Sequence, residues 1–277
     1  MARARGFALR AALLETGMLL TGVVFAFPLY LLLTLALKPQ SSWASDPLGL
    51  PTQLFFGNVT AAWTQAHLAS AMLTSALVVV ASTVILVVLG ALAAYWIARR
   101  VGRLSYGVYL FFIAGMILPF QLALIPLYST MRELGLLGSP ASLILFYPGL
   151  KLPLTIFLYA GFIRSLSRSY EEAASMDGAN QWQVFWHVVL PMMRPITGTV
   201  VILNGVFIWN DFLTPLLYLS GSRWATLPVV IYTFVGQESG DMGLVFGGLL
   251  VAMTPVLIAF FVLQRHMIKG FAGGLKG

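Results

Sequence analysis

Residues 169–191 read SYEEAASMDGANQWQVFWHVVLP, and this stretch decides how the rest of the chain is interpreted. It contains Glu172-Ala173-Ala174, then Gly178, and after nine further residues Val188-x-Leu190-Pro191. The stretch is polar and is turned by a glycine, although long hydrophobic segments lie on both sides of it. A short helix, a turn and a second helix between two membrane spans would offer a docking surface to a protein at the membrane face.

The composition is that of an integral membrane protein. Of the 277 residues, 59% are hydrophobic and 9% are charged, and the mean hydropathy is +0.90. Soluble domains contain about 25% charged residues, so this chain cannot cover itself with a surface compatible with water. There is no cysteine, and the three histidines lie far apart, which argues against a metal site or a catalytic centre. No P-loop motif occurs, so any ATP and Mg²⁺ must be bound by another chain.

Several segments are long and apolar enough to span a bilayer, which takes about 20 residues. The sequence predicts six spans, which are Gly17–Leu37, Ala71–Ala98, Tyr106–Leu127, Ala141–Ile163, Ile196–Leu219 and Gly243–Leu263. The first is interpreted as an uncleaved span and not as a signal peptide, because no clear cleavage site follows it. An even number of spans puts both termini on the same side, and residues 38–70 then form the largest loop on the opposite side.

The basic residues indicate which side is cytoplasmic. Twelve of the sixteen Lys and Arg residues fall on the side of the termini, and they are Arg3, Arg5, Arg10, Arg99, Arg100, Arg103, Arg164, Arg168, Arg194, Arg265, Lys269 and Lys276. The positive-inside rule therefore predicts that both termini are cytoplasmic. The formal net charge of +7 is then a signal of topology, and nucleic-acid binding is not expected.

The capping residues of the central stretch predict its local structure. Ser169 and Glu172 fit a capping box at the start of a first helix. Gly178 suits a left-handed cap at the end of that helix. Asn180 can cap a second helix over Gln181–Leu190, which stops at Pro191. From the residues alone, a docking surface and an amphipathic hairpin resting on the membrane are equally acceptable interpretations.

The pattern of the stretch resembles the signature loop of ABC importer permeases, with Val188 where the family has Ile. Further motifs resemble the carbohydrate-uptake permeases, and in particular the type of the six-span maltose permease subunit; these motifs are Leu118-Pro119-Phe120-Gln121, Trp209-Asn210-Asp211 and the tail Gly273–Gly277. The family's tail has a small residue at the position of Leu275. The resemblance implies an all-α, type I ABC importer permease fold, with one transmembrane permease domain over residues 1–277.

The resemblance also implies the partners and the contact residues. An ATPase subunit would bind the loop at about residues 165–195, through Glu171, Glu172, Ala173, Ala174, Asp177, Gly178, Leu190 and Pro191. The expected assembly in the inner (plasma) membrane contains a second homologous permease, two ATP-binding subunits and an extracytoplasmic sugar-binding protein. ATP hydrolysis belongs to the ATPase subunits, so this chain is expected to be no enzyme and to bind no cofactor of its own.

Polar residues inside the spans are the candidates for a translocation path, because an ionisable group in a bilayer is costly. The candidates are Gln121, Lys151, Asn204, Trp209, Asn210 and Asp211. Carboxylate, amide and ammonium groups would hydrogen-bond sugar hydroxyls, and Trp209 would stack on a sugar ring. A structural role stays open for Asp211, either at a helix break or in a pair with Lys151.

Two other classes of membrane protein are weighed against the importer. An ion-coupled secondary transporter of small polar solutes needs carboxylates inside the membrane, and only Asp211 is clearly available. An intramembrane enzyme needs a catalytic pair or a metal cluster within the spans, and the sequence offers neither. The loop pattern is unexplained in both alternatives.

Overall fold

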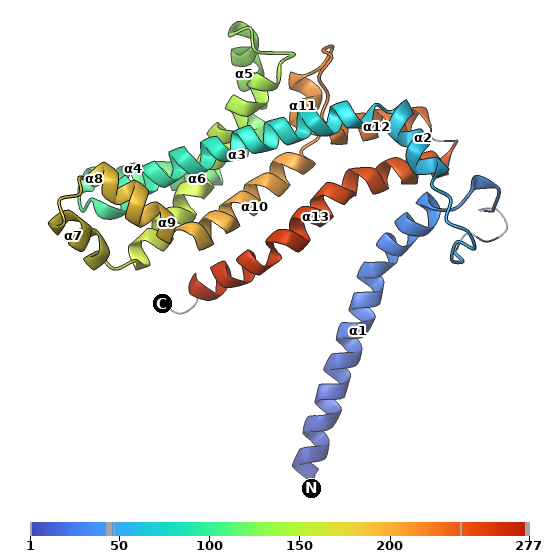
Figure 1. Ribbon diagram of the computed structural model, residues 1–277, viewed down its shortest axis with the longest axis horizontal. Coiled ribbons are helices and arrows are strands. Elements are labelled where there is room, and N and C mark those ends of the chain that lie inside the picture. The colour runs from blue at the N-terminus through green and yellow to red at the C-terminus, as the bar shows by residue number, and fades with distance from the viewer. Residues whose placement is uncertain (1, 43–45, 47, 239, 275–277) are drawn as a thin grey trace. The chain divides into compact units, whose positions relative to one another are not determined.

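The computed structural model describes residues 2–42, 46, 48–238 and 240–274, with side chains over 13–42, 46, 48–238, 240–258 and 261–262. No β-strand occurs among the described residues, and the all-α fold is confirmed (Figure 1). The α-helices are α1 (Ala2–Ala36), α2 (Gly57–Gln65), α3 (Leu68–Arg99), α4 (Arg103–Ile117), α5 (Phe120–Glu133), α6 (Pro140–Ser165), α7 (Ser169–Met176), α8 (Gln181–Val184), α9 (Leu190–Met192), α10 (Arg194–Asn210), α11 (Leu213–Tyr218), α12 (Leu227–Gln237) and α13 (Met242–Gly274). A 3₁₀ turn, η1 (Gln40–Ser42), and a π-helical segment, η2 (Phe185–Val189), complete the described elements.

Three helices are long and apolar enough to cross a membrane, namely Leu13–Ala36 within α1, α3 and α6. The number rises to five if each of two bent pairs is one span: α4 with α5, and residues Gln181–Met192 with α10. The predicted span Gly243–Leu263 falls inside α13, where the apolar helix found is the shorter Met242–Ile258. The predicted count of six spans is compatible with these helices and stays a prediction.

Two of the predicted spans are broken and not continuous. The stretch Tyr106–Leu127 turns by 99° between α4 and α5. The backbone is extended at Leu118, with a ψ of 126°, because the ring of the following Pro119 disfavours the α conformation there. The stretch Ile196–Leu219 is interrupted at Asp211, which also has a ψ of 126° and separates α10 from α11.

The chain divides into two compact units, which are Met1–Leu68 with Ile231–Thr254, and Ala69–Val230 with Pro255–Gly277. Within the first unit, Asn58 of α2 is buried and donates from Nδ2 to the carbonyl oxygens of Ala36 (3.1 Å) and Lys38 (2.8 Å). These bonds satisfy carbonyl groups that the end of α1 leaves unpaired. The predicted loop 38–70 therefore contains a short helix that ties it to α1. A single membrane domain over the whole chain stays a prediction.

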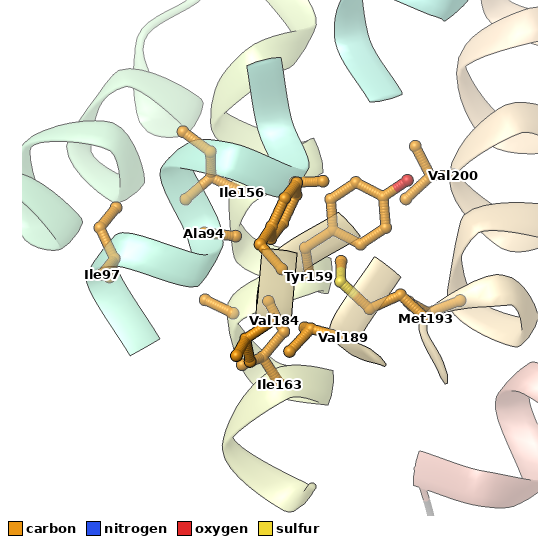
Figure 2. Close-up of a cluster of buried hydrophobic side chains, with 13 residues drawn as sticks. Ala94, Ile97, Ile156, Tyr159, Ile163, Val184, Val189, Met193 and Val200 are labelled. Carbon is orange, nitrogen blue, oxygen red and sulfur yellow. The ribbon is translucent and has the colours of Figure 1, made fainter. Parts of the chain in front are cut away.

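The second unit has a core where α3, α6 and α10 meet the short helices between α6 and α10. Its fully or nearly buried members are Ala91, Ala94, Ile97, Ile156, Tyr159, Ala160, Ile163, Val184, Phe185, Val189, Met193, Ile196 and Val200. In Figure 2 the side chains of Val184 and Val189 lie among those of Ile163, Tyr159 and Met193. The segment from α8 to η2 is thus built into the core of this unit and is not an appendage.

A close approach at Gly90 joins three helices of the second unit. A Cβ atom at Gly90 in α3 would lie 2.4 Å from Cγ2 of Thr155 in α6. The hydroxyl of Thr155 donates to the carbonyl oxygen of Lys151 (3.0 Å) and accepts a bond from Nδ2 of Asn204 in α10 (3.1 Å). Thr155 cannot rotate away without losing these bonds, so the position needs glycine.

Substitution of Gly90 by alanine is expected to destabilise the protein by about 2 kcal/mol, because the added methyl group overpacks the contact with Thr155. Gly161→Ala in α6 is the matched control, since no atom lies within 4 Å of its Cβ position. The control should be neutral or slightly stabilising. Thermal unfolding of the detergent-solubilised chains provides the measurement, and equal midpoints for the two variants would contradict the close approach.

Candidate functional site

α7 begins at Ser169, and its first turn carries two of the three acidic residues of the loop, Glu171 and Glu172. The predicted capping box of Ser169 and Glu172 is wrong. Arg168 occupies the cap position without a side-chain bond, and the Ser169 hydroxyl bonds the hydroxyl of Ser167 at 2.7 Å. The helix begins one residue earlier than a Ser169 cap requires, and Glu171 and Glu172 lie in its first turn. Their negative charges are favourable there, because the helix dipole is positive at this end.

The turn after α7 has the predicted left-handed glycine. Gly178 has a φ of +89°, in the region that other residues disfavour. The Gly178 N–H donates to the carbonyl of Ser175 (3.1 Å), and the Ala179 N–H donates to that of Ala174 (3.0 Å). These two bonds form a Schellman motif, which closes the helix and sets the direction of the chain that leaves it. The prediction for Gly178 is confirmed.

Asn180 caps the second loop helix, as the sequence predicts, and the structure shows that it does so in a capping box with Gln183. The Gln183 N–H donates to Oδ1 of Asn180 at 2.9 Å, and the Asn180 N–H donates to Oε1 of Gln183 at 2.9 Å. The helix then widens into η2 and continues as α9 to Met192, so the predicted end at Pro191 is wrong. Leu190 packs against the core cluster and Pro191 is half-buried. Both residues lie in α9, where the loop joins the core of the second unit.

One face of α7 is turned toward its own chain. Glu171 Oε1 accepts from Nε of Arg99 at 2.7 Å and lies 2.6 Å from Nη2 of the same guanidinium. Its other oxygen, Oε2, accepts the hydroxyl of Tyr95 at 3.0 Å. Ala174 on this side packs against the core cluster. Glu171 and Ala174, two of the expected ATPase contacts, therefore hold α7 on the end of α3 in this structure.

The opposite face of α7 is exposed. Glu172, Ala173, Asp177 and Gly178 all lie on it, and Met176 has 87% of its surface accessible. Large apolar side chains of the same loop, Tyr170 and Trp182, are also exposed. Exposed apolar side chains in an otherwise polar loop are candidates for a protein–protein contact. Figure 1 shows α7 and α8 close together at one end of the second unit.

A cleft of about 460 Å³ opens beside the exposed face. Tyr95 and Arg99 from the end of α3 line one side of it, and Glu172, Met176 and Gln181 from the loop line another. The cleft joins the part of α7 that is bound to α3 with the part that is exposed. Acidic and basic groups thus meet apolar ones in a concave surface.

The two charged residues predicted inside the spans do not pair: Asp211 lies at a helix break, and Lys151 lies within the continuous helix α6. Asp211 accepts the hydroxyl of Tyr147 at Oδ2 (3.1 Å) and the N–H of Thr214 at Oδ1 (3.4 Å), so it braces the break between α10 and α11. The Lys151 ammonium lies 3.0 Å from the ring centroid of Phe207. Neither of the two ion pairs found among the described residues joins Lys151 to Asp211.

The other candidates for the path differ in exposure. Asn204 is 1% exposed and bonds Thr155 between α10 and α6, so it is closed off in this conformation. Trp209 is half-buried, and Asn210 is exposed while its amide donates to the carbonyl of Val206. Gln121 is exposed in the first turn of α5. Each residue that remains accessible lies within a turn of a break in its span.

Tyr95, Arg99 and Arg168 belong to the site, and sequence reasoning did not find them. Arg99 was interpreted only as a topology signal, whereas its guanidinium binds Glu171. Tyr95 and Arg99 are four residues apart and share a helix face, which is the signal that the sequence does contain. Their partner lies 72 residues beyond Arg99, and nothing local points to it.

The chain is similar in sequence to known proteins. The sequence profile of the family described as binding-protein-dependent transport system inner membrane component matches residues 86–272. The chain is 35% identical over 252 residues to the melibiose/raffinose/stachyose import permease protein MelC of Bacillus subtilis (strain 168), covering 90% of this chain and 91% of that protein. It is 34% identical to the diacetylchitobiose uptake system permease protein NgcG of Streptomyces coelicolor, covering 95% and 88%.

Solved structures share the fold. A chain from the crystal structure of a bacterial ABC transporter involved in the import of the acidic polysaccharide alginate gives a TM-score of 0.80 at 20% identity, covering 94% of this chain and 96% of that chain. A chain from the bacterial alginate ABC transporter in complex with an alginate pentasaccharide-bound periplasmic protein gives 0.65 at 15% identity, covering 93% and 96%. At these identities the likeness concerns the fold, and the predicted type I ABC importer permease fold is confirmed.

Replacement of Asn180 by alanine removes the capping box, which is expected to cost about 1 kcal/mol of local stability. Amide hydrogen exchange at residues 181–184 should then be about fivefold faster. Asn180→Asp keeps a capping oxygen and serves as the control. Equal exchange rates in the alanine variant and the parent chain would show that the cap does not hold α8.

Proposed function

Because the chain belongs to the family of binding-protein-dependent transport system inner membrane components, we propose that it is one permease subunit of an ATP-driven sugar importer. Sugar as the cargo is supported by relatives that are named for the uptake of oligosaccharides and that align over nearly their whole length. The observation that carries the proposal is the two-sided α7, which is bound to its own chain on one face and exposed on the other.

The exposed face of α7 is the docking surface for a separate ATPase subunit. Met176 and Trp182 supply accessible apolar area, and such residues are enriched at the centres of protein interfaces. Glu172 and Asp177 supply charges that would fix the orientation of the partner. The ATPase binds ATP and Mg²⁺, so the chain itself carries out no covalent chemistry.

The full importer contains a second homologous permease, two ATP-binding subunits and an extracytoplasmic sugar-binding protein. The permeases lie in the inner membrane, in contact with lipid, and their spans form the translocation path between them. Both termini of this chain are cytoplasmic, an orientation supported by the distribution of Lys and Arg.

Transport follows alternating access. ATP closes the pair of ATPase subunits, α7 moves with the subunit it contacts, and the spans turn from an inward-facing to an outward-facing arrangement. Hydrolysis of ATP returns the spans to the inward-facing arrangement. Such coupling requires the docked α7 to favour different arrangements of the spans in the two nucleotide states.

The path is lined in part by Gln121, Lys151, Trp209, Asn210 and Asp211. The proposal is supported by their accessibility and, for all of them except Lys151, by their place beside helix breaks, where polar backbone groups need water or a ligand. Lys151 is set apart by an ammonium group that contacts a phenyl ring and no carboxylate within 4 Å. Asn204 would reach the path only after α10 separates from α6.

Uptake energetics distinguish the importer from an ion-coupled carrier. Native vesicles that contain the transport system are loaded with ATP or left without it, and uptake of labelled raffinose and diacetylchitobiose is measured with and without a proton and sodium uncoupler. Uptake that needs ATP and survives the uncoupler is expected. Uptake that is driven by an ion gradient without ATP would overturn the proposal.

Substitution of Gly178 by leucine is expected to abolish ATP-driven uptake and co-purification of the ATPase, because the Schellman turn is lost and α7 is reoriented. Gly135→Leu is the matched control: Gly135 also has a positive φ (+68°) and open space around it, but it lies between α5 and α6. Normal uptake in the Gly178 variant would refute the docking role of the loop.

Substitution of Lys151 by methionine removes a hydrogen-bond donor from the path while keeping an unbranched side chain. We expect KM for the sugar to rise about fivefold to tenfold, the value of roughly one hydrogen bond. Lys151→Arg retains the charge and should fall between the parent and the methionine variant. Unchanged KM and unchanged sugar preference in correctly assembled transporter would exclude Lys151 from the path.

A further inference from the structure

The end of α3 and the start of α7 are joined by reciprocal polar contacts. The Arg99 guanidinium binds the Glu171 carboxylate and also donates from Nη2 to the carbonyl oxygen of Leu166 at 3.2 Å. In the other direction, Arg168 donates from Nη2 to the carbonyl oxygen of Arg99 at 3.2 Å. Tyr95 adds its hydroxyl to the same carboxylate. Both oxygens of Glu171 are therefore used, and the chain is held before α7 as well as within it.

The ion pair is largely shielded from water. The side chains of Arg99 and Glu171 are 13% and 15% exposed. A shielded, charge-assisted pair is shorter and stronger than an exposed one, and loss of one partner leaves the other charge without compensation. Arginine suits this position because its planar group can bind the carboxylate and a backbone carbonyl at once. The contact is thus directional and strong.

The two neighbouring glutamates divide between two tasks. Consecutive residues of an α-helix point in directions about 100° apart. Glu171 faces Arg99, while Glu172 is exposed on the docking face. A partner that binds the outer face of α7 therefore acts on a helix whose inner face is already bound to α3.

α3 continues from this contact into the centre of the second unit. Its residues Ala91, Ala94 and Ile97 belong to the core cluster, and Gly90 touches Thr155 of α6. Thr155 in turn bonds Asn204 of α10. Displacement of the end of α3 would therefore be transmitted to α6, which carries Lys151, and to α10.

We propose that Arg99 and Tyr95 are positioning residues that lock α7 to α3, so that movement of the docked α7 is transmitted to the spans. We call the set Tyr95, Arg99 and Glu171 the α3–α7 latch. The proposal rests on the proposed function, and it assigns to these residues a contact within this chain that is separate from binding of the ATPase or of the sugar. Apolar contacts such as that of Ala174 also hold α7, but they are not directional and let helices slide. The hydrogen bonds and the ion pair of the latch are directional, so they fix the position of α7 relative to α3.

The test uses the complete transporter in proteoliposomes, with its binding protein and a transported sugar. Three variants remove the latch, namely Arg99→Ala, Glu171→Ala and the double variant. Arg100→Ala is the matched control, because it deletes the same charge from the next residue, whose guanidinium lies over the Trp96 ring. Measured quantities are the amount of co-purified ATPase, the rate of ATP hydrolysis and the sugar transported per ATP.

We expect the ATPase to remain bound in each latch variant while sugar transported per ATP falls about tenfold, within the range of typical coupling between sites. The double variant should lose no more than either single one, since both changes remove the same interaction. Arg100→Ala should behave as the parent. Normal coupling in Arg99→Ala, or additive losses in the double variant, would overturn the latch. A fall confined to assembly, with normal transport per ATP, would also overturn it, because the role would then be structural only.

A covalent cross-link in place of the ion pair tests whether a physical link between α3 and α7 is sufficient for coupling. The chain contains no cysteine, so Arg99→Cys with Glu171→Cys creates the only thiol pair in this subunit. A short bis-methanethiosulfonate reagent should restore about wild-type transport per ATP in this uncoupled variant. Failure to restore it, despite complete cross-linking, would contradict the latch. If the parent complex shows no ATP-driven uptake at all, the proposed function has failed and not the latch.

Discussion

A helix of two turns is not stable by itself in water, and this constraint governs the whole loop. The eight residues of α7 depend on contacts with the rest of the chain: the Glu171–Arg99 pair, burial of Ala174 and the Schellman turn at Gly178. Since these contacts occupy one face, only the opposite face is left for a partner. The contacts that stabilise α7 therefore also attach it to α3, while its opposite face stays open to a partner.

A second constraint acts within the membrane, where backbone groups freed by a helix break must find partners. Asp211 supplies one at the break between α10 and α11 by accepting the Thr214 N–H. Lys151 lies in α6 between two prolines that also remove backbone bonds. Asp211, which satisfies a backbone group at the break, is also one of the residues proposed to contact the polar solute. Structural and transport roles are therefore not exclusive at these positions.

The local features of the site could be predicted from the sequence, because caps and turns are encoded by neighbouring residues. Gly178 and Asn180 belong to this class. Proline is a helix breaker, so Pro119 permits a break in the predicted span Tyr106–Leu127, but the neighbouring residues do not specify the angle of 99° between α4 and α5. The role of Glu171 could not be predicted, since its partner Arg99 lies on a different helix. The predicted capping box of Ser169 and Glu172 is wrong because α7 begins without a side-chain cap, with Arg168 in the cap position. Leu275 and the rest of the tail after Gly274 lie outside the described residues.

The most direct measurement is photo-crosslinking from the outer face of α7 in native membranes. A benzoylphenylalanine probe replaces Met176, which is 87% exposed, and the same probe at Leu145, an exposed residue of α6, serves as the control. The expected product from position 176 is an adduct with a chain that carries a P-loop ATPase motif, identified by mass spectrometry and absent from the control. A transport-competent chain that yields no protein adduct at position 176 would contradict the claim that this face binds an ATPase.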